Sequence, residues 1–347
     1  MKPVALVTGE VSPYRREPFR LLGEAEGLEV LTFREGESSG DDPHSLTIRR
    51  TSERGVGRLI ASDRYRAVIA GIGGRVALPA SYAAARARGI PFVLWTSLWA
   101  HPRSPVHALS YLPTRRLYRR ADAVVTYGPH VSAYVKETRD SGNVFEAPQA
   151  VSAQHFGAPV KPAPKQAELM LLFVGRLVRE KGVRILLDAW READLGKDAI
   201  LAFAGEGPIK PAGRGVRTLG RVEGQALPAL YAAADALVLP SIRTATFLEP
   251  WGLVVNEAMH QGTPVIASDA VGAVAGGLVR DGRNGLVVPA GDARALATRI
   301  EALAANAELR RQLGEAAKRD VEPFSETAWV EGMQRALQAV GAARGAR

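Results

Sequence analysis

Short apolar runs alternate with stretches of helical spacing along most of the chain. The runs lack the polar alternation of half-exposed strands, so they predict strands buried on both faces of a parallel sheet. In the first half they are KPVALVTG, LEVLTF, YRAVIAG, IPFVLWTS and ADAVVTYG, and in the second LMLLFVG, AILAFAG, VRTLG, ADALVLPS and TPVIAS. Helical stretches such as REPFRLLGEAE and GVRILLDAWREA lie between them. This βαβα order predicts an α/β fold with doubly wound sheets that have helices on both faces.

A proline-rich segment near the middle of the chain, residues 155–168 (HFGAPVKPAPKQAE), divides this pattern. Its prolines favour extended backbone, and we interpret it as a linker. The sequence therefore predicts two Rossmann-type domains with a cleft between them, and ligands at the carboxyl ends of the strands. The predicted divisions are an N-terminal domain over 1–160, a C-terminal domain over 161–322, and a final helical segment over 323–347.

Composition narrows the function classes only partly. The 347 residues are enough for two domains, and the absence of cysteine excludes disulfides and thiolate chemistry. The first apolar stretch is too short for a signal peptide, and no run approaches a membrane span, so we expect a cytoplasmic location. The net charge of +9 indicates an anionic partner: a nucleotide, a phosphorylated substrate, an acidic membrane surface or nucleic acid.

Two acids stand eight positions apart in TFLEPWGLVVNEAMHQGTPVIAS. Proline favours the first helical position, so the pattern predicts a helix from Pro250, with Glu249 just before it and Glu257 nearly two turns inside. Carboxylates in these places can accept hydrogen bonds from sugar hydroxyls and from a ribose diol. The alternative is structural: Glu249 caps the helix and Glu257 is solvated.

The turn between these acids can approach an anion closely. Free backbone N–H groups of Trp251, Gly252 and Leu253 can face a phosphate at the start of the helix, and glycine leaves room for it. Upstream, Arg176 and Lys181 follow the strand LLFVG at the same predicted edge of the sheet. Two cations there can clamp a diphosphate and stabilise charge on a leaving group, although two solvated surface cations are the alternative.

Five ordered segments give the second half a family resemblance. They are FVGRLVREKG, FAGEGP, LGRVEGQALPALYAAADALVLPS, EPWGLVVNEAMHQGTPVIASDAVGA and LVRDGRNGLVVPAGD. Together they resemble the C-terminal half of the retaining GT-B glycosyltransferases of family 4, over about residues 170–300. The resemblance implies a GT-B fold: two Rossmann-like domains that face a central cleft, and a C-terminal helix that crosses back to the first domain.

The resemblance also implies roles for individual residues. Arg176 and Lys181 would hold the nucleotide diphosphate, Glu257 the ribose hydroxyls, and Glu249 would face the transferred sugar. The remaining donor-binding positions, mostly backbone, would be Gly205, Leu219, Arg221, Trp251, Gly252 and Leu253. Family members retain the anomeric configuration and need no metal ion or other cofactor. The sequence agrees, because it has no metal-ligand pattern such as HxxxH, DxD or CxxC.

The first half matches the family less closely. Many members have a Gly-Gly loop after the first strand, whereas this chain has TGEVSPYRREPF, similar to some enzymes of bacterial surface-polysaccharide synthesis. Gly9 would let the backbone approach the donor phosphates. Arg15 and Arg16 would bind an acceptor phosphate or, alternatively, only begin a solvated helix. Gly73, in the turn of VIAGIGGRVALP, is a further candidate for acceptor contact.

One histidine is a candidate for the chemistry itself. The family usually places a histidine near the sugar at the end of a first-domain strand, and His101 is the only candidate within 91–104. It would donate a hydrogen bond to the sugar or orient the acceptor. The alternative is a loop histidine packed by Trp99 and Pro102.

A basic stretch, HALSYLPTRRLYRRADA, has helical spacing. Its cations share one predicted face and are Arg115, Arg116, Arg119 and Arg120. Such a helix can rest on an anionic membrane, and the family resemblance supports this, because many members glycosylate lipid-linked acceptors. The alternative is the charged face of a buried helix.

The sequence thus predicts a metal-independent retaining hexosyltransferase. The expected donor is a nucleotide-diphosphate sugar, with UDP as the expected nucleotide, and the acceptor is a glycan or a lipid-linked glycan in surface polysaccharide or glycolipid synthesis. We expect the enzyme to be cytoplasmic, peripheral at the inner face of the cell membrane, and not to bind nucleic acid. The alternatives are a non-hydrolysing sugar-nucleotide epimerase and a non-enzymatic nucleotide- or polyanion-binding protein.

Overall fold

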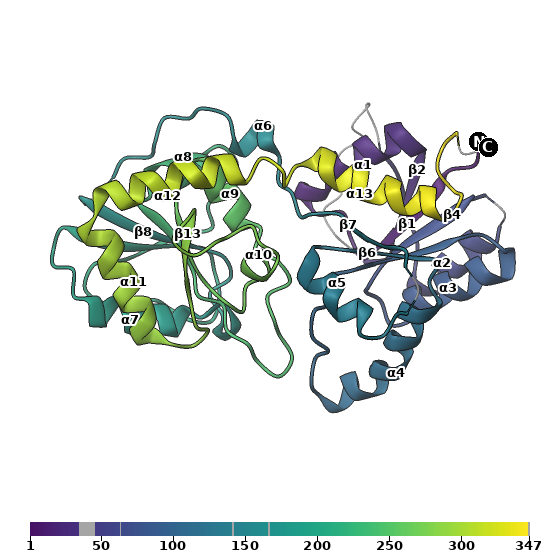
Figure 1. The fold of residues 1–347 in the computed structure, drawn as a ribbon, viewed down its shortest axis with the longest axis horizontal. Helices are drawn as coiled ribbons and strands as arrows, with labels where there is room; N and C mark the ends of the chain where they lie inside the picture. Colours follow the sequence, from purple (N-terminus) through teal and green to yellow (C-terminus); the bar gives the residue numbers. More distant parts are fainter. Residues whose placement is uncertain (35–45, 63, 141, 166, 346–347) are drawn as a thin grey trace. The chain divides into compact units, whose positions relative to one another are not determined.

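The computed structural model consists of two compact units, each built on its own parallel sheet (Figure 1). It describes residues 1–34, 46–62, 64–140, 142–165 and 167–345. The first unit contains Met1–His101, Pro105–Gln149 and Glu326–Arg347, and the second contains Pro102–Ser104 and Ala150–Ser325. The predicted α/β doubly wound architecture is confirmed.

The sheet of the first unit has, within the described residues, seven parallel strands in the order β3-β2-β1-β4-β5-β6-β7. They are β1 (Val4–Thr8), β2 (Leu28–Thr32), β3 (Thr47–Arg50), β4 (Ala67–Gly71), β5 (Phe92–Thr96), β6 (Ala123–Thr126) and β7 (Val144–Glu146). Strand β1 pairs with both β2 and β4, so the strand order reverses between β1 and β4. Open α/β sheets bind ligands at such a reversal, beyond the carboxyl ends of the strands.

Helices cover both faces of this sheet. They are α1 (Pro13–Glu26), α2 (Glu53–Ala61), α3 (Ala77–Arg88), α4 (Pro105–Arg120), α5 (Pro129–Lys136) and α13 (Glu326–Ala339). Phe19 of α1 and Trp329 of α13 pack with Val4 of β1, whereas α2 to α5 pack on the face that presents Ala5. The continuous apolar run of β1 therefore fills both layers, because successive side chains point to opposite faces. The prediction that the C-terminal helix returns to the first domain is confirmed by α13.

The sheet of the second unit runs in the order β10-β9-β8-β11-β12-β13. Its strands are β8 (Leu169–Val174), β9 (Ala199–Ala204), β10 (Val216–Gly220), β11 (Ala236–Leu239), β12 (Val265–Ser268) and β13 (Gly285–Val288). The order reverses between β8 and β11, which pair directly. This places a second ligand-binding crevice at the carboxyl ends of β8 and β11.

The second unit contains both short helical elements and longer helices. They are α6 (Ala153–Phe156), the 3₁₀ turn η1 (Arg179–Lys181), α7 (Val183–Ala193), α8 (Ala226–Ala233), α9 (Val254–His260), α10 (Gly272–Ala275), α11 (Ala293–Ala305) and α12 (Ala307–Asp320). Helices α7 and α11 pack on Leu171 and Phe173 of β8, while α9 packs on β11 and β12. Across the ranges that the structure describes, no helix is long and apolar enough to cross a membrane.

Three strands were not among the predicted runs. Strand β3 has the sequence TIRR at an exposed edge, so it lacks the apolar run of a buried strand. Strand β7 has only three residues, and β13 only four, GLVV. The ten predicted strands are all present, because each is buried on both faces or pairs with a buried neighbour.

The segment predicted as a linker lies within the second unit. The units change at Gln149/Ala150 and at Ser325/Glu326, whereas the sequence placed these changes at 160/161 and 322/323. Downstream of α6, Ala163 N donates to Ala229 O at 2.9 Å and Lys165 Nζ pairs with Asp235 at 2.5 Å. These contacts hold the extended, proline-rich chain on the second unit.

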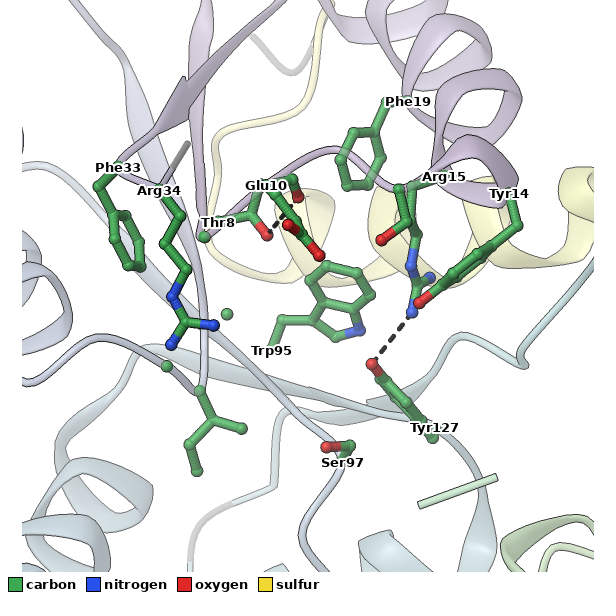
Figure 2. A pocket seen from close by; sticks show the side chains of 15 residues that line it. Thr8, Glu10, Tyr14, Arg15, Phe19, Phe33, Arg34, Trp95, Ser97 and Tyr127 are labelled. Carbon is green, nitrogen blue, oxygen red and sulfur yellow. Dashed lines mark hydrogen bonds between the residues drawn. The ribbon is translucent and has the colours of Figure 1, made fainter. Parts of the chain in front are cut away.

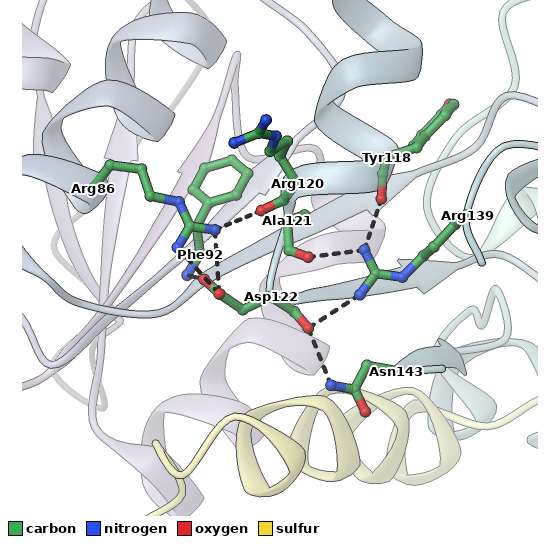
Figure 3. A network of polar contacts seen from close by, with 8 residues as sticks. All are labelled: Arg86, Phe92, Tyr118, Arg120, Ala121, Asp122, Arg139 and Asn143. Carbon is green, nitrogen blue, oxygen red and sulfur yellow. Dashed lines mark hydrogen bonds and ion pairs between the residues drawn. The ribbon is translucent and has the colours of Figure 1, made fainter. Parts of the chain in front are cut away.

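A buried arginine anchors the end of α4 (Figure 3). Arg139 is 4% exposed, and its Nη1 donates to the carbonyls of Tyr118, at 2.7 Å, and Ala121, at 2.8 Å. Cations favour helix C-termini, where carbonyl groups lack helical partners. Nearby, Arg86 pairs with Asp122 at 3.1 Å, and Asp122 accepts from Phe92 N at 2.7 Å. The C-terminal end of α4 is therefore fixed to β5 and β6.

Candidate functional site

The predicted donor-site residues follow strands of the second sheet at its carboxyl edge. Arg176 follows β8, Gly205 follows β9, and Leu219 is the next-to-last residue of β10. Because these strands are parallel, their carboxyl ends meet at one edge. The edge also receives the loop that contains Glu249, which bridges to Val271 beyond β12.

At the centre of this edge lies a buried ion pair. Lys181 Nζ is 2.5 Å from Glu249 Oε2, and the same oxygen accepts a hydrogen bond from Ser241 Oγ at 3.0 Å. The side chains of Lys181 and Glu249 are only 16% and 7% exposed. The cation predicted for the diphosphate and the acid predicted for the sugar are therefore in direct contact, which the spacing in the sequence did not indicate.

A glycine places Lys181 against β11. Gly182 has φ 72°, in the left-handed region, and a Cβ there would lie 1.9 Å from Pro240 O. Only glycine permits both the conformation and the close approach. The backbone reinforces the contact, because Ile242 N donates to Glu180 O at 2.9 Å.

The helix after Pro250 begins later than predicted. Helix α9 starts at Val254, because Gly252 has φ 91°, which an α-helix does not contain. The prediction that Pro250 occupies the first helical position is therefore wrong, and Glu257 lies in the first turn rather than nearly two turns inside. Trp251 is buried, and its Nε1 donates to Asn256 Oδ1 at 2.7 Å. Trp251 and Gly252 thus form a rigid turn that separates Glu249 from α9.

Glu257 is held by a buried tyrosine on the neighbouring helix. Tyr231, in α8, is fully buried and donates its hydroxyl hydrogen to Glu257 Oε2 at 2.6 Å. Burial raises the pKa of the Glu257 carboxyl to about 7, while the hydrogen bond from Tyr231 acts in the opposite direction. The pKa of Tyr231 is raised as well, by its own burial and then by the charge of Glu257, so the tyrosine remains a donor. The carboxylate keeps Oε1 for other partners.

The other charged candidates of this unit are exposed. Arg176 has a 67% exposed side chain and lies 3.8 Å from Glu180. Arg221 is 73% exposed and pairs with Glu223 at 2.5 Å, and Leu219 is 40% exposed. Gly205 lies where its Cβ would be 1.9 Å from Gly175 O, so its first role is to let the ends of β8 and β9 approach. Among the charged candidates of this unit, the structure brings Lys181 and Glu249 into direct contact.

The candidates of the first unit divide between two places. Gly9 and Gly73 line a cavity with Arg15, whereas Arg16 is exposed on α1. His101 Nε2 lies 2.7 Å from His107 O, at the start of α4, and its ring packs edge-on against Tyr111. His101 Nδ1 is buried and, among the described residues, has no hydrogen-bond partner. This ring is thus held by α4.

Sequence reasoning missed the residues that support the predicted ones. Ser241 ends the apolar run ADALVLPS, and Tyr231 precedes that run on α8. A hydroxyl at the end of a parallel strand is a usable signal for Ser241, because such ends meet ligands. No comparable signal exists for Tyr231, whose contact with Glu257 joins residues 26 positions apart.

Comparison with known proteins gives a family match over the second unit. Residues 158–320 match the family model described as "Glycosyl transferases group 1". An alpha-D-kanosaminyltransferase from Streptomyces kanamyceticus is 29% identical over 197 residues, 54% of this chain and 47% of that protein. A phosphatidyl-myo-inositol mannosyltransferase from Mycobacterium leprae is 36% identical over 151 residues, 41% of this chain and 39% of that protein. The chain spans less than half the length of these curated relatives.

Solved structures resemble the chain over almost its whole length. A sucrose-phosphate synthase from Thermosynechococcus elongatus has a TM-score of 0.78 at 20% identity, covering 97% of this chain and 98% of that one. Alr3699/HepE from Anabaena, in complex with UDP and glucose, has a TM-score of 0.78 at 18% identity, covering 97% and 100%. At these identities the likeness concerns the fold, and it confirms the predicted GT-B fold.

Proposed function

Because residues 158–320 match the model of the glycosyl transferases group 1, we propose that the chain belongs to this family and transfers a sugar from a nucleotide-diphosphate sugar. The proposed donor is a UDP-sugar, and the proposed acceptor is a glycan or a lipid-linked glycan in surface polysaccharide or glycolipid synthesis. The observation that carries the proposal is the buried Lys181–Glu249–Ser241 cluster at the reversal of the second sheet, inside the matched segment. A buried cation and a buried acid at one sheet edge fit the two halves of such a donor.

In the proposed donor complex each half of the cluster has one partner. The ammonium group of Lys181 donates to the diphosphate, and Arg176 is a second cation from the exposed loop. Charge-assisted hydrogen bonds to phosphate are strong. Glu249, fixed by Ser241, accepts from hydroxyls of the sugar. Glu257, fixed by Tyr231, accepts from the ribose diol with its remaining oxygen. The backbone at Gly205, Leu219, Arg221 and Trp251–Leu253 is proposed to border the nucleotide, and Gly9 to approach its phosphates.

The proposed reaction retains the anomeric configuration and needs no metal ion. The bond between the anomeric carbon and the phosphate oxygen breaks, and the acceptor oxygen attacks from the same face. The acceptor proton passes to the departing diphosphate, whose charge Lys181 and Arg176 stabilise. His101 is proposed to donate a hydrogen bond to the sugar or to orient the acceptor. We propose that catalysis rests on positioning and electrostatics rather than on a pair of acids of the kind that a hydrolase uses.

Two other functions predict different products. A non-hydrolysing sugar-nucleotide epimerase would change the sugar and release the nucleoside diphosphate only slowly. A nucleotide- or polyanion-binding protein without catalytic activity would release none. Transfer is favoured over polyanion binding because Glu249 and Glu257 are each oriented by a buried hydroxyl group, which a surface of solvated charges would not require. The released nucleoside diphosphate separates transfer from epimerisation.

The test is a screen of UDP-, GDP- and ADP-sugars that measures thermal stabilisation and nucleoside diphosphate release. We expect one nucleotide class to stabilise the chain and to be released, and Glu257→Ala to weaken both effects. Glu301→Ala, which removes an exposed acid of α11, is the matched control and should behave as wild type. Absence of stabilisation by every donor would overturn the proposed function.

We also propose that the chain is cytoplasmic and contacts the inner face of the membrane through α4. Leu109 and Leu112 are 81% and 73% exposed, and they share a helical face with Arg116 and Arg120, which are also exposed. Of the other two arginines, Arg115 is held by the Tyr111 hydroxyl at 2.7 Å, and Arg119 by the carbonyl of Thr138 at 3.1 Å. We name Leu109, Leu112, Arg116 and Arg120 the α4 face. Exposed leucines followed by basic residues suit an anionic lipid surface.

A further inference from the structure

The first unit has its own cavity at the reversal between β1 and β4 (Figure 2). Its volume is about 240 Å³, and it is lined at the carboxyl ends of β1, β4, β5 and β6 and at the start of α1. This volume lies below the roughly 300–1,000 Å³ of pockets for drug-sized ligands, and it suits one sugar residue with a charged substituent.

The wall of this cavity contains a buried arginine without an acid. Arg15 is 6% exposed, and its Nη2 donates to Tyr127 Oη at 3.0 Å and to Gln149 Oε1 at 2.5 Å. Its guanidinium lies 4.4 Å from the ring centre of Trp95 and 4.9 Å from that of Tyr14. Figure 2 shows Arg15 near these two rings. In the described parts of the chain no carboxylate pairs with it.

An uncompensated buried charge is unfavourable unless something else pairs with it. The aromatic faces and two neutral acceptors offset part of the cost, but both acceptors engage Nη2. The N–H groups on Nε and Nη1 remain for a ligand. Each of them can donate a charge-assisted hydrogen bond to a carboxylate or a phosphate.

Further donors converge on the same cavity. Trp95 is 6% exposed and lines it, and its Nε1 is buried without a hydrogen-bond acceptor in the described chain. Helix α1 begins there with no acid in its first turn, and the side chain of its N-cap, Ser12, makes no capping hydrogen bond. The positive end of the helix dipole is therefore not offset locally.

The charges that line the cavity favour an anion. Arg34 reaches it from the loop after β2, and Glu10, the one acid among the lining residues that the structure describes, is exposed. Arg34 also acts on Glu53 outside the cavity, where it helps to lower the pKa of that carboxyl after two backbone hydrogen bonds. Among the described lining residues, two arginines and a helix N-terminus stand against one solvated carboxylate.

We propose that this cavity binds an anionic group, a carboxylate or a phosphate, on the sugar that accepts the transferred residue. The proposal rests on the proposed transferase function and specifies its acceptor as an acidic or phosphorylated glycan. Arg15 donates a charge-assisted hydrogen bond to this group, Trp95 Nε1 and the start of α1 donate to the same group, and Arg34 contributes long-range attraction. Arg16, its exposed neighbour on α1, takes no part.

The test is a calorimetric titration of the full chain with glucuronate, glucose 6-phosphate and neutral glucose. We expect at least one charged sugar to bind about tenfold or more tightly than glucose, and the tighter of the two to identify the carboxylate or the phosphate. Arg15→Gln should lower that affinity by about 10- to 100-fold, whereas the matched control Arg16→Gln should leave it within about twofold. Equal affinities for charged and neutral sugars, or equal effects of the two variants, would overturn the proposal.

A second variant keeps the test independent of any folding defect in Arg15→Gln. Gly73 lines the cavity, and a Cβ added there meets nothing within 4 Å, so Gly73→Leu narrows the cavity without a clash in the fold. It should abolish binding of the charged sugar. UDP is titrated into the same samples. Binding of UDP without binding of either charged sugar overturns the acceptor inference and leaves the donor function standing. Binding of a charged sugar without binding of UDP overturns the donor function. A loss of UDP affinity in Arg15→Gln would assign the cavity to the donor and contradict the inference.

Discussion

At the scale of single residues, the ion pair between Lys181 and Glu249 is the central contact of the candidate donor site. Both side chains are largely buried, so each compensates the charge of the other. A buried pair contributes little net stability, but removal of one partner leaves an isolated charge. In the proposed donor complex, a diphosphate and a sugar would compete with this pair for its two groups.

The ion pair predicts an asymmetric response to mutation. Lys181→Ala should lower the free energy of unfolding of the second unit by about 3–5 kcal/mol, because it leaves Glu249 charged and buried. Adding Glu249→Gln should recover part of that loss, since it removes the unpaired charge. Urea unfolding followed by circular dichroism measures both, with the exposed Lys210→Ala as the control. A double variant no more stable than Lys181→Ala would show that the pair is not the cause.

Glu257 predicts a pH dependence of nucleotide binding. Its pKa is raised from 4.5 to about 7 by burial, and only the ionised carboxylate can accept two hydroxyl hydrogens beside the bond from Tyr231. The affinity for UDP should therefore fall as the pH falls through 7, by about tenfold between pH 8 and pH 6. In Glu257→Gln the part of the pH dependence that comes from this carboxyl group should vanish. The pH dependence that remains comes from the titration of the phosphate of UDP. Calorimetric titration at both pH values measures it, and equal slopes for the two proteins would contradict the assignment.

The same pKa shift has the opposite sign for stability. A carboxyl group whose pKa is higher in the folded chain than in the unfolded chain favours folding when protonated. Its contribution is fully present below about pH 4.5 and is lost as the pH rises through about 7. The group that improves ligand binding at neutral pH therefore destabilises the free chain there, as is common at functional sites.

The sequence predicted the members of this site but not their contacts. Glu249, Glu257 and Lys181 were identified by spacing and by the resemblance, because motif positions are local. The Lys181–Glu249 contact joins residues 68 positions apart, and it exists because β8 and β11 are neighbours in the sheet. Arg15 was predicted as a phosphate ligand or a solvated residue, and its sandwich between Trp95 and Tyr14 follows only from the packing of α1 on the sheet.

At the scale of elements, glycines determine where the helices of the site begin. Gly182 ends η1 and precedes α7, and Gly252 delays α9 until Val254. The start of the helix was predicted wrongly at Pro250. Proline favours the first helical position, but it does not determine the φ angle of a glycine two residues later. Local preference was overridden by a glycine that packs against Leu239 and Val271.

The close contact between Gly182 and Pro240 O predicts that two glycines of similar conformation respond differently to substitution by alanine. Gly182→Ala and Gly196→Ala both place alanine at positive φ, 72° and 82°, which costs about 1 kcal/mol each. Only Gly182→Ala also clashes with Pro240 O, whereas the Cβ at Gly196 meets open space. Gly182→Ala should lower the thermal midpoint several degrees further and abolish nucleotide binding. Equal midpoints for the two variants would contradict the proposed packing.

The α4 face predicts binding to anionic membranes. Each basic residue near such a surface contributes about 1 kcal/mol, so Arg116→Glu with Arg120→Glu should reduce vesicle binding by at least tenfold. Co-sedimentation with vesicles of phosphatidylglycerol and phosphatidylcholine measures the change. Arg191→Glu with Arg294→Glu makes the same charge change on exposed residues of the second unit and serves as the control. An equal loss in both pairs would indicate general charge rather than the α4 face.

At the scale of the whole molecule, both sheets place their candidate ligand groups at the same topological position. In the first unit the cavity lies where the order reverses between β1 and β4, and in the second the buried ion pair lies where it reverses between β8 and β11. The sequence predicted this position because uninterrupted apolar runs indicate parallel sheets. The sequence did not predict the edge strand β3, because its arginines give it a polar composition that is typical of a loop.

The measurement that tests the central claim most directly is a crystal structure of the full chain with UDP at saturating concentration. We predict nucleotide at the carboxyl edge of the second sheet, with the ribose hydroxyls on Glu257 and the diphosphate within hydrogen-bond distance of Lys181. Nucleotide in the cavity lined by Arg15, elsewhere on the surface, or at no site would contradict the account.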